Sequence, residues 1–218
     1  WRVPRVYAGA HLAEYDRGRG FREVVTERGL RNCHGIFYEV PRDISGGLGK
    51  LKPIATHNRM IPDYCSWRGL LVMSGVRPRA EADGHVFGQK PGLWFGVVDD
   101  LWKLGRPVGY GGPWRATQVE AGVWSDPYLM RGFDEKVLEL SHDRPTAVRF
   151  RIELDVSDVG DWVHYVTFEV GPGESLVHRF PIGFMAGWIR VQASENCAAT
   201  AQLRYGPLEP VVSMLEAR

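Results

Sequence analysis

The last third of the chain alternates apolar and polar residues with a period of two, and this constrains the fold more than any other feature. In the segment 147–154 the apolar residues share one face, and arginine or glutamate fills most positions between them. These apolar residues are Val148, Phe150, Ile152 and Leu154. Alternate residues of a β-strand point to opposite sides of its sheet. The segment therefore predicts a strand with one buried and one wet side.

Five further segments repeat this behaviour, with turn sequences such as SHDRP, SDVGD and GPGE between them. They are 136–140, 162–170, 175–180, 188–193 and 197–205. Short strands with one apolar face each are typical of an antiparallel β-sandwich. We therefore expect a β-sandwich over residues 126–210 and a tail at 211–218 that forms at most a short helix.

The first 125 residues show a different pattern, because their apolar runs are continuous rather than alternating. The runs are 35–40, 70–76 and 93–105. Strands that are buried on both faces have such sequences, and the inner strands of β-propeller blades are of this kind. We expect a loop at 106–114 and little helix, with 20–29 as a helical candidate.

One pair of segments resembles a recurring bacterial arrangement. They are GLWFGVVDDLWKLGRPVGYGGPW (92–114) and SDPYLMRGFDEKVLELSHD (125–143). They are similar to the junction between the last blades of a β-propeller and an appended β-sandwich, found among carbohydrate-active enzymes and their relatives. The resemblance implies an all-β chain in which residues 1–125 form two to three blades of a partial β-propeller, followed by the small antiparallel sandwich.

The resemblance has further implications. A complete propeller has more blades than this chain holds, and the chain does not begin with methionine. We therefore expect a missing N-terminal part and contacts with the missing blades. A secreted or periplasmic location is also expected from the resemblance, although the sequence shows no signal peptide.

The stretch THNRMIPDYCSWRG (56–69) contains many functional side-chain types directly before the apolar run LLVMSGV. If that run is an inner propeller strand, residues 57–67 form a loop at the mouth of the central channel. We then expect Asp63 and Tyr64 to act in catalysis. The expected substrate-binding residues are His57, Asn58, Arg59, Trp67 and Arg68. Planar hydrogen-bonding groups and an aromatic ring suit a carbohydrate. The alternative is that these residues only hold a long loop in place.

His34 precedes the apolar run 35–40 just as the stretch 56–69 precedes its own run. Two polar clusters at the same end of adjacent strands would converge, so His34 could transfer a proton with Asp63 or Tyr64. A capping or hydrogen-bonding role is the alternative. Asp99 and Asp100 point to opposite sides if they lie on a strand. One of them could complete a glycosidase carboxyl pair with Asp63, or could pair with Lys103 or Arg106.

Trp188 falls on the polar side of the segment 188–193, with Arg190 and Gln192. An exposed tryptophan on a sheet can stack on a sugar ring. It can also pack against a neighbouring domain, and we favour that second role for Trp188.

Composition and missing motifs exclude several classes of function. The net charge of +1 gives no basis for binding nucleic acid or an anionic membrane surface, and no apolar run approaches ~18 residues. No phosphate-binding loop, serine nucleophile elbow or zinc motif occurs. We expect no cofactor and no metal. Cys33, Cys65 and Cys197 are far apart in the sequence, and buried free thiols are favoured over a disulfide.

These observations favour a carbohydrate-active protein, part of a glycoside hydrolase or polysaccharide lyase that acts at a propeller mouth. Its partner would be a carbohydrate or another small polar ligand. The alternative is a non-catalytic carbohydrate-binding or structural interaction module. A further alternative is the structural end of an enzyme. The sequence leaves open whether the protein is an enzyme.

Overall fold

The computed structural model shows an all-β protein and describes residues 2–6, 21–24, 28–41, 50–57, 59–61, 63–74, 77–78 and 92–206. In these residues the strands form five antiparallel sheets. The chain divides into two compact units, one made of Trp1–Pro4 with Val108–Arg218 and the other of Arg5–Pro107. The expected antiparallel sandwich is confirmed, and the described residues form no closed propeller.

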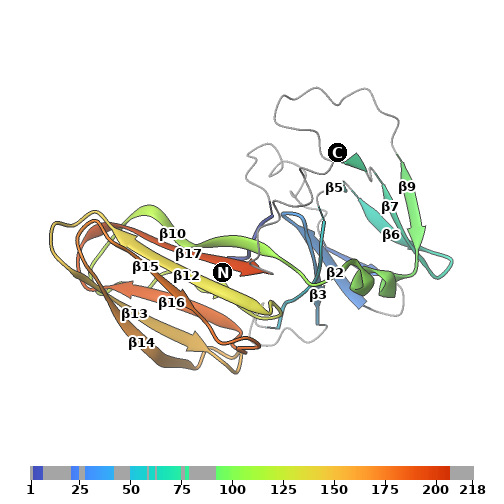
Figure 1. Ribbon diagram of the computed structural model, residues 1–218. Helices are drawn as coiled ribbons and strands as arrows, with labels where there is room; N and C mark the ends of the chain where they lie inside the picture. Colours follow the sequence, from blue (N-terminus) through green and yellow to red (C-terminus); the bar gives the residue numbers. More distant parts are fainter. Residues whose placement is uncertain are drawn as a thin grey trace. The chain divides into compact units, whose positions relative to one another are not determined.

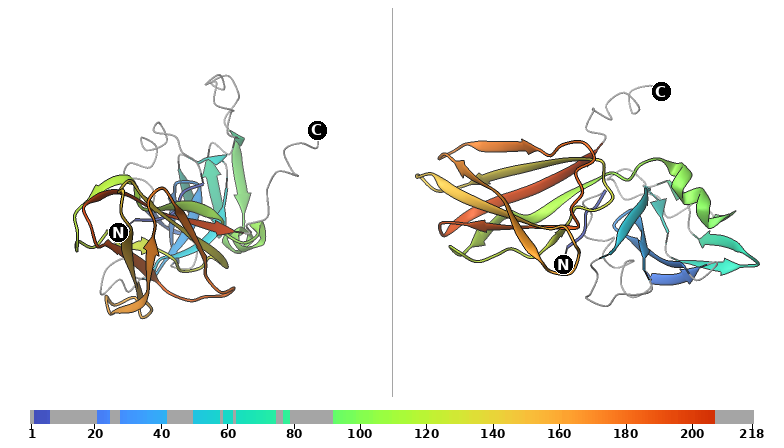
Figure 2. Two further views of the ribbon diagram at one scale, coloured as in Figure 1. Left: turned by 60° about the vertical axis from the view of Figure 1, so that its left-hand side comes forward. Right: turned by 90° about the horizontal axis from the view of Figure 1, so that it is seen from below.

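The unit that contains Val108–Arg218 is the β-sandwich. Its first sheet has the strand order β10 (Gly109–Val119), β17 (Cys197–Gly206), β12 (Glu135–His142) and β15 (Ser175–Arg179). Its second sheet has the order β11 (Tyr128–Leu129), β16 (Trp188–Ala193), β13 (Val148–Asp155) and β14 (Trp162–Val170). The two sheets form the two layers seen in Figures 1 and 2.

The core of the sandwich consists of the alternating residues that the sequence indicates. Val148, Phe150 and Ile152 are fully buried on β13, and the expected inward residues of β16 and β17 are also buried. The six predicted strands are therefore confirmed. Trp188 differs, because its side chain is fully buried rather than exposed. Trp188 is paired with Asp155 of the neighbouring strand β13. The Asp155 carboxylate accepts hydrogen bonds from the main-chain N–H groups of Asp158 and Gly160 in the following turn.

The strand β10 occupies residues that the sequence suggests are a loop. Its glycines and Pro113 resemble loop residues, but β10 is an edge strand, so a missing main-chain N–H there breaks no ladder. The register shifts between Gly111 and Trp114, as in a β-bulge. A Cβ atom on Gly112 would lie 2.0 Å from the carbonyl oxygen of Ala201. Glycine is therefore required by close contact between two strands.

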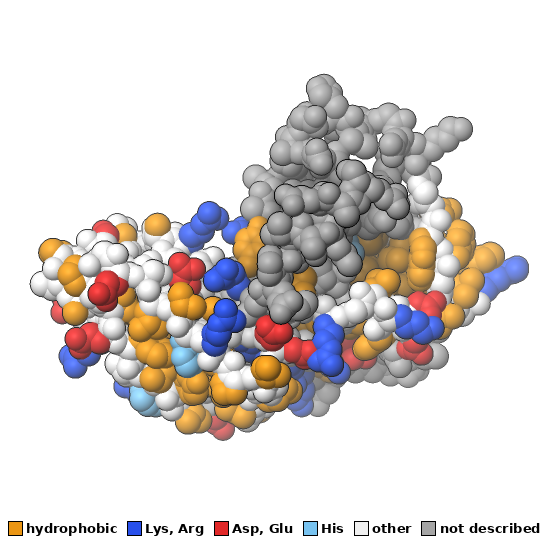
Figure 3. Space-filling model, viewed as in Figure 1, with side chains coloured by type: hydrophobic (Ala, Val, Ile, Leu, Met, Phe, Trp, Pro, Cys, Tyr) orange, Lys and Arg blue, Asp and Glu red, His pale blue; other side chains and the backbone are white. Residues whose placement is uncertain are grey.

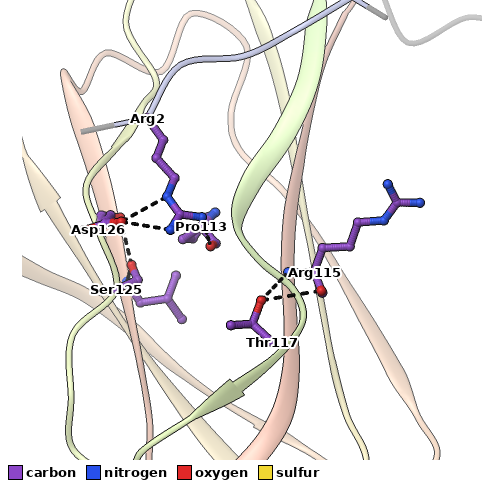
Figure 4. A network of polar contacts seen from close by, with 7 residues as sticks. Arg2, Pro113, Arg115, Thr117, Ser125 and Asp126 are labelled. Atoms are coloured by element: carbon purple, nitrogen blue, oxygen red, sulfur yellow. Dashed lines mark hydrogen bonds and ion pairs between the residues drawn. The ribbon is translucent and has the colours of Figure 1, made fainter. Parts of the chain in front are cut away.

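The N-terminal residues belong to the sandwich unit. Arg2 forms a bridge with Tyr128 of β11, and its main chain hydrogen-bonds to Pro127 and Leu129. Figure 4 shows the Arg2 guanidinium between the Asp126 carboxylate, 2.9 Å away, and the carbonyl oxygen of Pro113, also 2.9 Å away. Arg2 therefore links two segments of the sandwich that are far apart in the sequence.

The second unit, Arg5–Pro107, contains the other three sheets. A four-stranded sheet runs in chain order through β1 (Phe21–Val24), β2 (Arg28–Cys33), β3 (Ile36–Val40) and β4 (Lys52–Thr56). A three-stranded sheet contains β6 (Tyr64–Trp67), β7 (Leu70–Ser74) and β9 (Leu93–Gly96). The short strands β5 (Arg59–Met60) and β8 (Arg77–Pro78) pair with each other, and the 3-10 helix η2 spans Val98–Leu104.

A shared apolar cluster joins the four-stranded and three-stranded sheets. Leu30, Phe37 and Ala55 pack with residues from β6, β7 and η2. These partners are Tyr64, Leu71, Met73, Val98 and Leu101. On β3, the consecutive residues 36–38 are all buried, as expected for a strand covered on both faces.

Two sequence predictions for this unit are wrong. The helical candidate 20–29 contains β1 and the start of β2, which pair as antiparallel strands. Gly29 disfavours a helix, and pairing of β2 with β3 stabilises the strand. The run 93–105 is not one strand, because β9 ends at Gly96 and η2 follows. Asp99 and Asp100 therefore lie in a 3-10 turn, where Asp100 pairs with Lys103 at 2.7 Å, one of the alternatives expected.

Among the described residues, no helix is long and apolar enough to span a membrane.

Candidate functional site

Two hairpin turns position several of the candidate residues of the second unit. His34 and Gly35 connect β2 to β3, and Arg68 and Gly69 connect β6 to β7. All four have positive φ, from 50° to 85°. A two-residue turn with positive φ at both positions is the hairpin type that matches the twist of the flanking strands. His34 and Arg68 are therefore turn residues, and glycine in second place makes each turn favourable.

His57 lies beside the first of these turns. Its main-chain N–H donates to the carbonyl oxygen of Gly35 at 2.8 Å, and its Nε2 lies 2.8 Å from Oδ1 of Asn32. Asn32 also donates to the carbonyl oxygen of Ile61, while the His57 ring packs against Phe37. The structure thus brings His57 to the end of the sheet where His34 lies, next to the segment that leads to Asp63.

Tyr64 and Asp63 hold the start of β6 in place. Tyr64 is buried, donates its hydroxyl to the carbonyl oxygen of Leu30 at 2.6 Å, and packs edge-on against Phe37. The Asp63 carboxylate accepts a hydrogen bond from the main-chain N–H of Tyr64 at 2.9 Å. The main-chain carbonyl oxygen of Asp63 accepts two more, from the N–H and the hydroxyl of Ser74. These contacts have a structural explanation, since they fix one end of the β6–β7 hairpin.

Trp67 and Arg68 lie at the other end of that hairpin. Trp67 pairs with Leu70 next to the turn, whereas Tyr64 pairs with Met73 at the far end. Three residue steps along a strand correspond to about 10 Å. The Arg68 guanidinium lies 4.9 Å from the centre of the Trp67 ring, and both residues are exposed.

The stretch 56–69 is therefore not one loop. It contains the end of β4, then β5, β6 and a turn, and its candidate residues divide between two ends of a hairpin. Asn58 lies outside the described residues. Arg59 belongs to β5, opposite Pro78, and its side chain is outside the described part.

A second cluster lies on the outer face of the sandwich sheet that contains β16, β13 and β14. The Arg190 guanidinium lies 4.3 Å from the centre of the Trp124 ring and 4.4 Å from that of Trp162. One cation thus contacts two indole rings that come from different segments, and such contacts are attractive. Trp124 forms an isolated bridge with Gln192 of β16, and Trp162 begins β14.

Glu153 fixes the orientation of this cluster. Its carboxylate, 7% exposed, accepts Arg190 at 2.6 Å and Arg151 at 2.8 Å. Arg151 also lies 5.6 Å from the Trp124 ring. Arg190 bonds through both Nε and a terminal nitrogen, which gives a defined plane to its guanidinium. The result is a pre-organised surface of aromatic rings and hydrogen-bond donors.

Sequence reasoning missed this cluster for identifiable reasons. The alternation of β16 correctly placed Arg190 and Gln192 on the outer face. It also placed Trp188 there, although this side chain is buried. Trp162 stands at the beginning of its strand, and Trp124 precedes the sandwich strands found by alternation. The sequence places Arg190 and Glu153 on the polar sides of their own segments, but it does not show that β16 and β13 are neighbours and that the two opposite charges lie side by side.

The sandwich also contains titratable groups whose pKa values are shifted by burial. Burial lowers the pKa of Lys136 to about 8, and its ammonium donates to the carbonyl oxygens of Phe133 and Phe184. Tyr165 and His178 contact each other at 3.1 Å. Burial raises the pKa of Tyr165 and lowers that of His178, so both are favoured in their neutral forms.

Within the described part of the chain, no group of three or more histidine, cysteine, aspartate or glutamate side chains could hold a metal ion. Cys33 and Cys197 are buried and Cys65 is exposed, and none of the three forms a disulfide. No family model, curated protein or solved structure matches the chain.

Proposed function

We propose that this protein binds carbohydrate without transforming it, through the outer sandwich face at Trp124, Arg190 and Trp162. The observation that carries the proposal is the arrangement of Arg190 between the two indole rings, with Glu153 fixing the guanidinium. Indole rings offer an apolar surface to the C–H face of a pyranose ring. Arginine, glutamine and histidine side chains around them offer hydrogen bonds to hydroxyl groups.

The surroundings of the cluster support a polar ligand. Gln192 lies next to Trp124, and Arg151 has a side chain that is half exposed. His164 lies on the same face beside Glu153 and contacts Thr167 at 3.1 Å. Because these groups are already held by one another, binding orders few side chains, and this lowers its entropic cost.

Carbohydrate turnover in the second unit is the second candidate function, and the contact between His57 and Asn32 favours it. A histidine whose ring is oriented by an amide is suited to proton transfer. In this hypothesis a glycoside hydrolase or polysaccharide lyase would use His34, His57 and Asp63. We rank turnover below binding for two reasons. Tyr64, which the sequence also suggested as a catalytic residue, has a structural role in the core. Trp67 and Arg68, two expected substrate-binding residues, lie at the opposite end of the β6–β7 hairpin.

The finer architecture is also a proposal. The sheet β1–β2–β3–β4 consists of four strands that are neighbours in chain order, which is the construction of a propeller blade. The sheet β6–β7–β9 lies face to face with it through the shared apolar cluster. These features support two successive blades of a partial β-propeller in the unit Arg5–Pro107, and a secreted carbohydrate-active protein in the sense of the resemblance.

Binding is tested by titrating the 218-residue chain with a panel of neutral and uronate-containing oligosaccharides. Trp162→Ala should weaken the affinity for any bound sugar at least about tenfold, equivalent to about 1.4 kcal/mol. Trp102→Ala, a partly exposed tryptophan in η2, is the matched control and should leave affinity unchanged. Equal losses in both variants, or no binding by the wild type, would contradict the proposal.

Turnover is tested on the same panel by measuring new reducing ends and unsaturated products. His57→Gln and Asp63→Asn should abolish any activity if the second candidate is correct. Binding by the wild type without any product supports the first candidate alone.

A further inference from the structure

The charge of a ligand at the outer sandwich face is selected by the side chains next to the two indole rings, not by the charge of the whole protein. The net charge of the chain is +1. On the side of the molecule shown in Figure 3, acidic and basic side chains are both spread over the sandwich at the left. A ligand therefore meets no general field of one sign, and the local pairing of charges decides what is bound.

Two arginines next to these rings share a single carboxylate. Arg190 and Arg151 lie 2.6 Å and 2.8 Å from the oxygens of Glu153. The three side chains together carry one more positive than negative charge. Because the Glu153 side chain is only 7% exposed, a ligand meets the guanidinium groups rather than the carboxylate.

The other acidic side chains of β13 and β14 do not remove this excess. Glu169 stands opposite Arg149 in the register of the two strands, so their charges offset each other. Asp155 is fully buried, and the main chain of the following turn donates hydrogen bonds to its carboxylate. Four residues of extended strand, about 13 Å, separate Asp155 from Arg151, whereas salt screens charges beyond about 8 Å. The positive excess therefore stays at the two arginines that share a carboxylate.

Of these two arginines, Arg151 is the one that a ligand can reach. Arg190 bonds to Glu153 through both Nε and a terminal nitrogen, and its side chain is 24% exposed. Arg151 contacts Glu153 through one terminal nitrogen, and its side chain is 49% exposed. A guanidinium has five N–H donors in a fixed plane. Arg151 thus keeps donors for an acceptor that arrives from solvent, while the contact with Glu153 holds its orientation.

The neighbours of Arg151 suit a sugar that carries an anionic group. In the register of the sheet, Arg151 lies between Gln192 of β16 and Thr167 of β14, so its row contains no carboxylate. Its guanidinium lies 5.6 Å from the centre of the Trp124 ring. A pyranose ring against this indole would bring a charged substituent within reach of the guanidinium, beside the neutral donors and acceptors of the same row.

We propose that the outer sandwich face selects an acidic saccharide, with Arg151 binding its anionic group, a ring carboxylate or a sulfate ester, beside Trp124. The inference rests on the proposed carbohydrate binding and names the ligand class of that same site. Hydrogen bonds between a guanidinium and an anionic oxygen are stronger than those between neutral groups. A neutral sugar would use the indole rings but would leave the exposed guanidinium without an ionic partner.

The test uses an oligosaccharide of uronic acids, the same oligosaccharide with its carboxylates reduced to alcohols, and a sulfated form of the reduced product. Calorimetric titration of the 218-residue chain gives the affinity for each. We expect an acidic form to bind at least about tenfold more tightly than the reduced form, and the tighter acidic form identifies the anionic group. Equal affinity for all three would overturn this inference and leave carbohydrate binding intact, whereas no binding of any form would overturn both.

Arg151→Gln separates the contribution of the anionic group from that of the sugar ring. It should bind the acidic form at least about tenfold more weakly than the wild type. Its affinity for the reduced form should be unchanged, which also shows that the variant is folded. Arg149→Gln, two residues away on the same strand and opposite Glu169, is the matched control and should leave every affinity unchanged. A preference for the acidic form that survives in Arg151→Gln would overturn the assignment.

Discussion

Two exposed sheet faces of this protein place arginine against tryptophan, and they differ in what surrounds the pair. On the sandwich, Arg190 lies between two indole rings and is bound by the buried carboxylate of Glu153. On the sheet β6–β7–β9, Arg68 lies over Trp67, and the ring of Phe95 packs edge-on against Trp67 with 6.3 Å between the ring centres. The same pair of side chains thus occurs in a polar and in an apolar setting.

An aromatic ring with an arginine therefore does not define a ligand site by itself. Polar neighbours fix the guanidinium and supply hydrogen bonds for a soluble ligand. Apolar neighbours favour burial against another apolar surface.

The largest effect is expected at a buried tryptophan of the sandwich. Trp188→Ala should lower the free energy of unfolding by about 3–5 kcal/mol, because it removes a fully buried ring. Urea unfolding followed by circular dichroism measures this change. Trp67→Ala is the comparison and should cost less than about 1 kcal/mol, since half of that side chain is exposed. Similar losses in both variants would contradict the difference between the two settings.

Lys136 tests whether the sandwich interior is closed. Burial lowers its folded-state pKa to about 8 from 10.5, so between these values the unfolded chain binds more protons. The free energy of unfolding should therefore rise with pH across this window, by about 3 kcal/mol relative to Lys136→Met. Urea unfolding of both proteins at pH 7.5 and pH 10.5 measures the difference. Parallel pH profiles would show that Lys136 is well hydrated.

A smaller effect is expected at Tyr64 in the second unit. Tyr64→Phe removes the hydrogen bond to the carbonyl oxygen of Leu30 and should cost about 1–2 kcal/mol. Tyr165→Phe in the sandwich, whose hydroxyl is only partly buried, should cost less. Thermal unfolding compares the two. If Tyr64→Phe keeps full stability but loses a measured carbohydrate turnover, the residue is catalytic and the structural assignment is wrong.

The smallest effect is expected at the turn next to Trp67. Gly69 has a φ of 81° and no atom near the position of an added Cβ, so Gly69→Ala introduces only backbone strain. We expect a cost of about 1 kcal/mol. Gly69→Asn should cost less, because asparagine tolerates this conformation. The midpoint of urea unfolding measures both, and equal costs for alanine and asparagine would show that the turn does not require this geometry.

The sequence predicted the sandwich well because its strands alternate and because that alternation corresponds to burial. Phe150, Ile152 and Val191 are buried as the pattern requires. It failed at β10, where Gly112 is required by the close approach of Ala201. Such a requirement arises between strands that are about 90 residues apart, so a local pattern cannot show it.

The candidate residues were harder to predict because their roles depend on contacts distant in sequence. Tyr64 bonds to Leu30, 34 residues away in the sequence, and His57 contacts Asn32, 25 residues away. A cluster in the sequence became two ends of one hairpin, because a two-residue turn at Arg68 and Gly69 reverses the chain. The sandwich cluster combines Trp124, Trp162 and Arg190, which no short motif contains.

Isothermal titration calorimetry of one bound oligosaccharide with the wild type, Trp162→Ala and Trp67→Ala shows which of the two faces binds carbohydrate. We expect Trp162→Ala to weaken binding at least about tenfold and Trp67→Ala to bind as the wild type does. The reverse result, with affinity lost in Trp67→Ala and kept in Trp162→Ala, would contradict the assignment of carbohydrate binding to the sandwich face at Trp162 and Arg190.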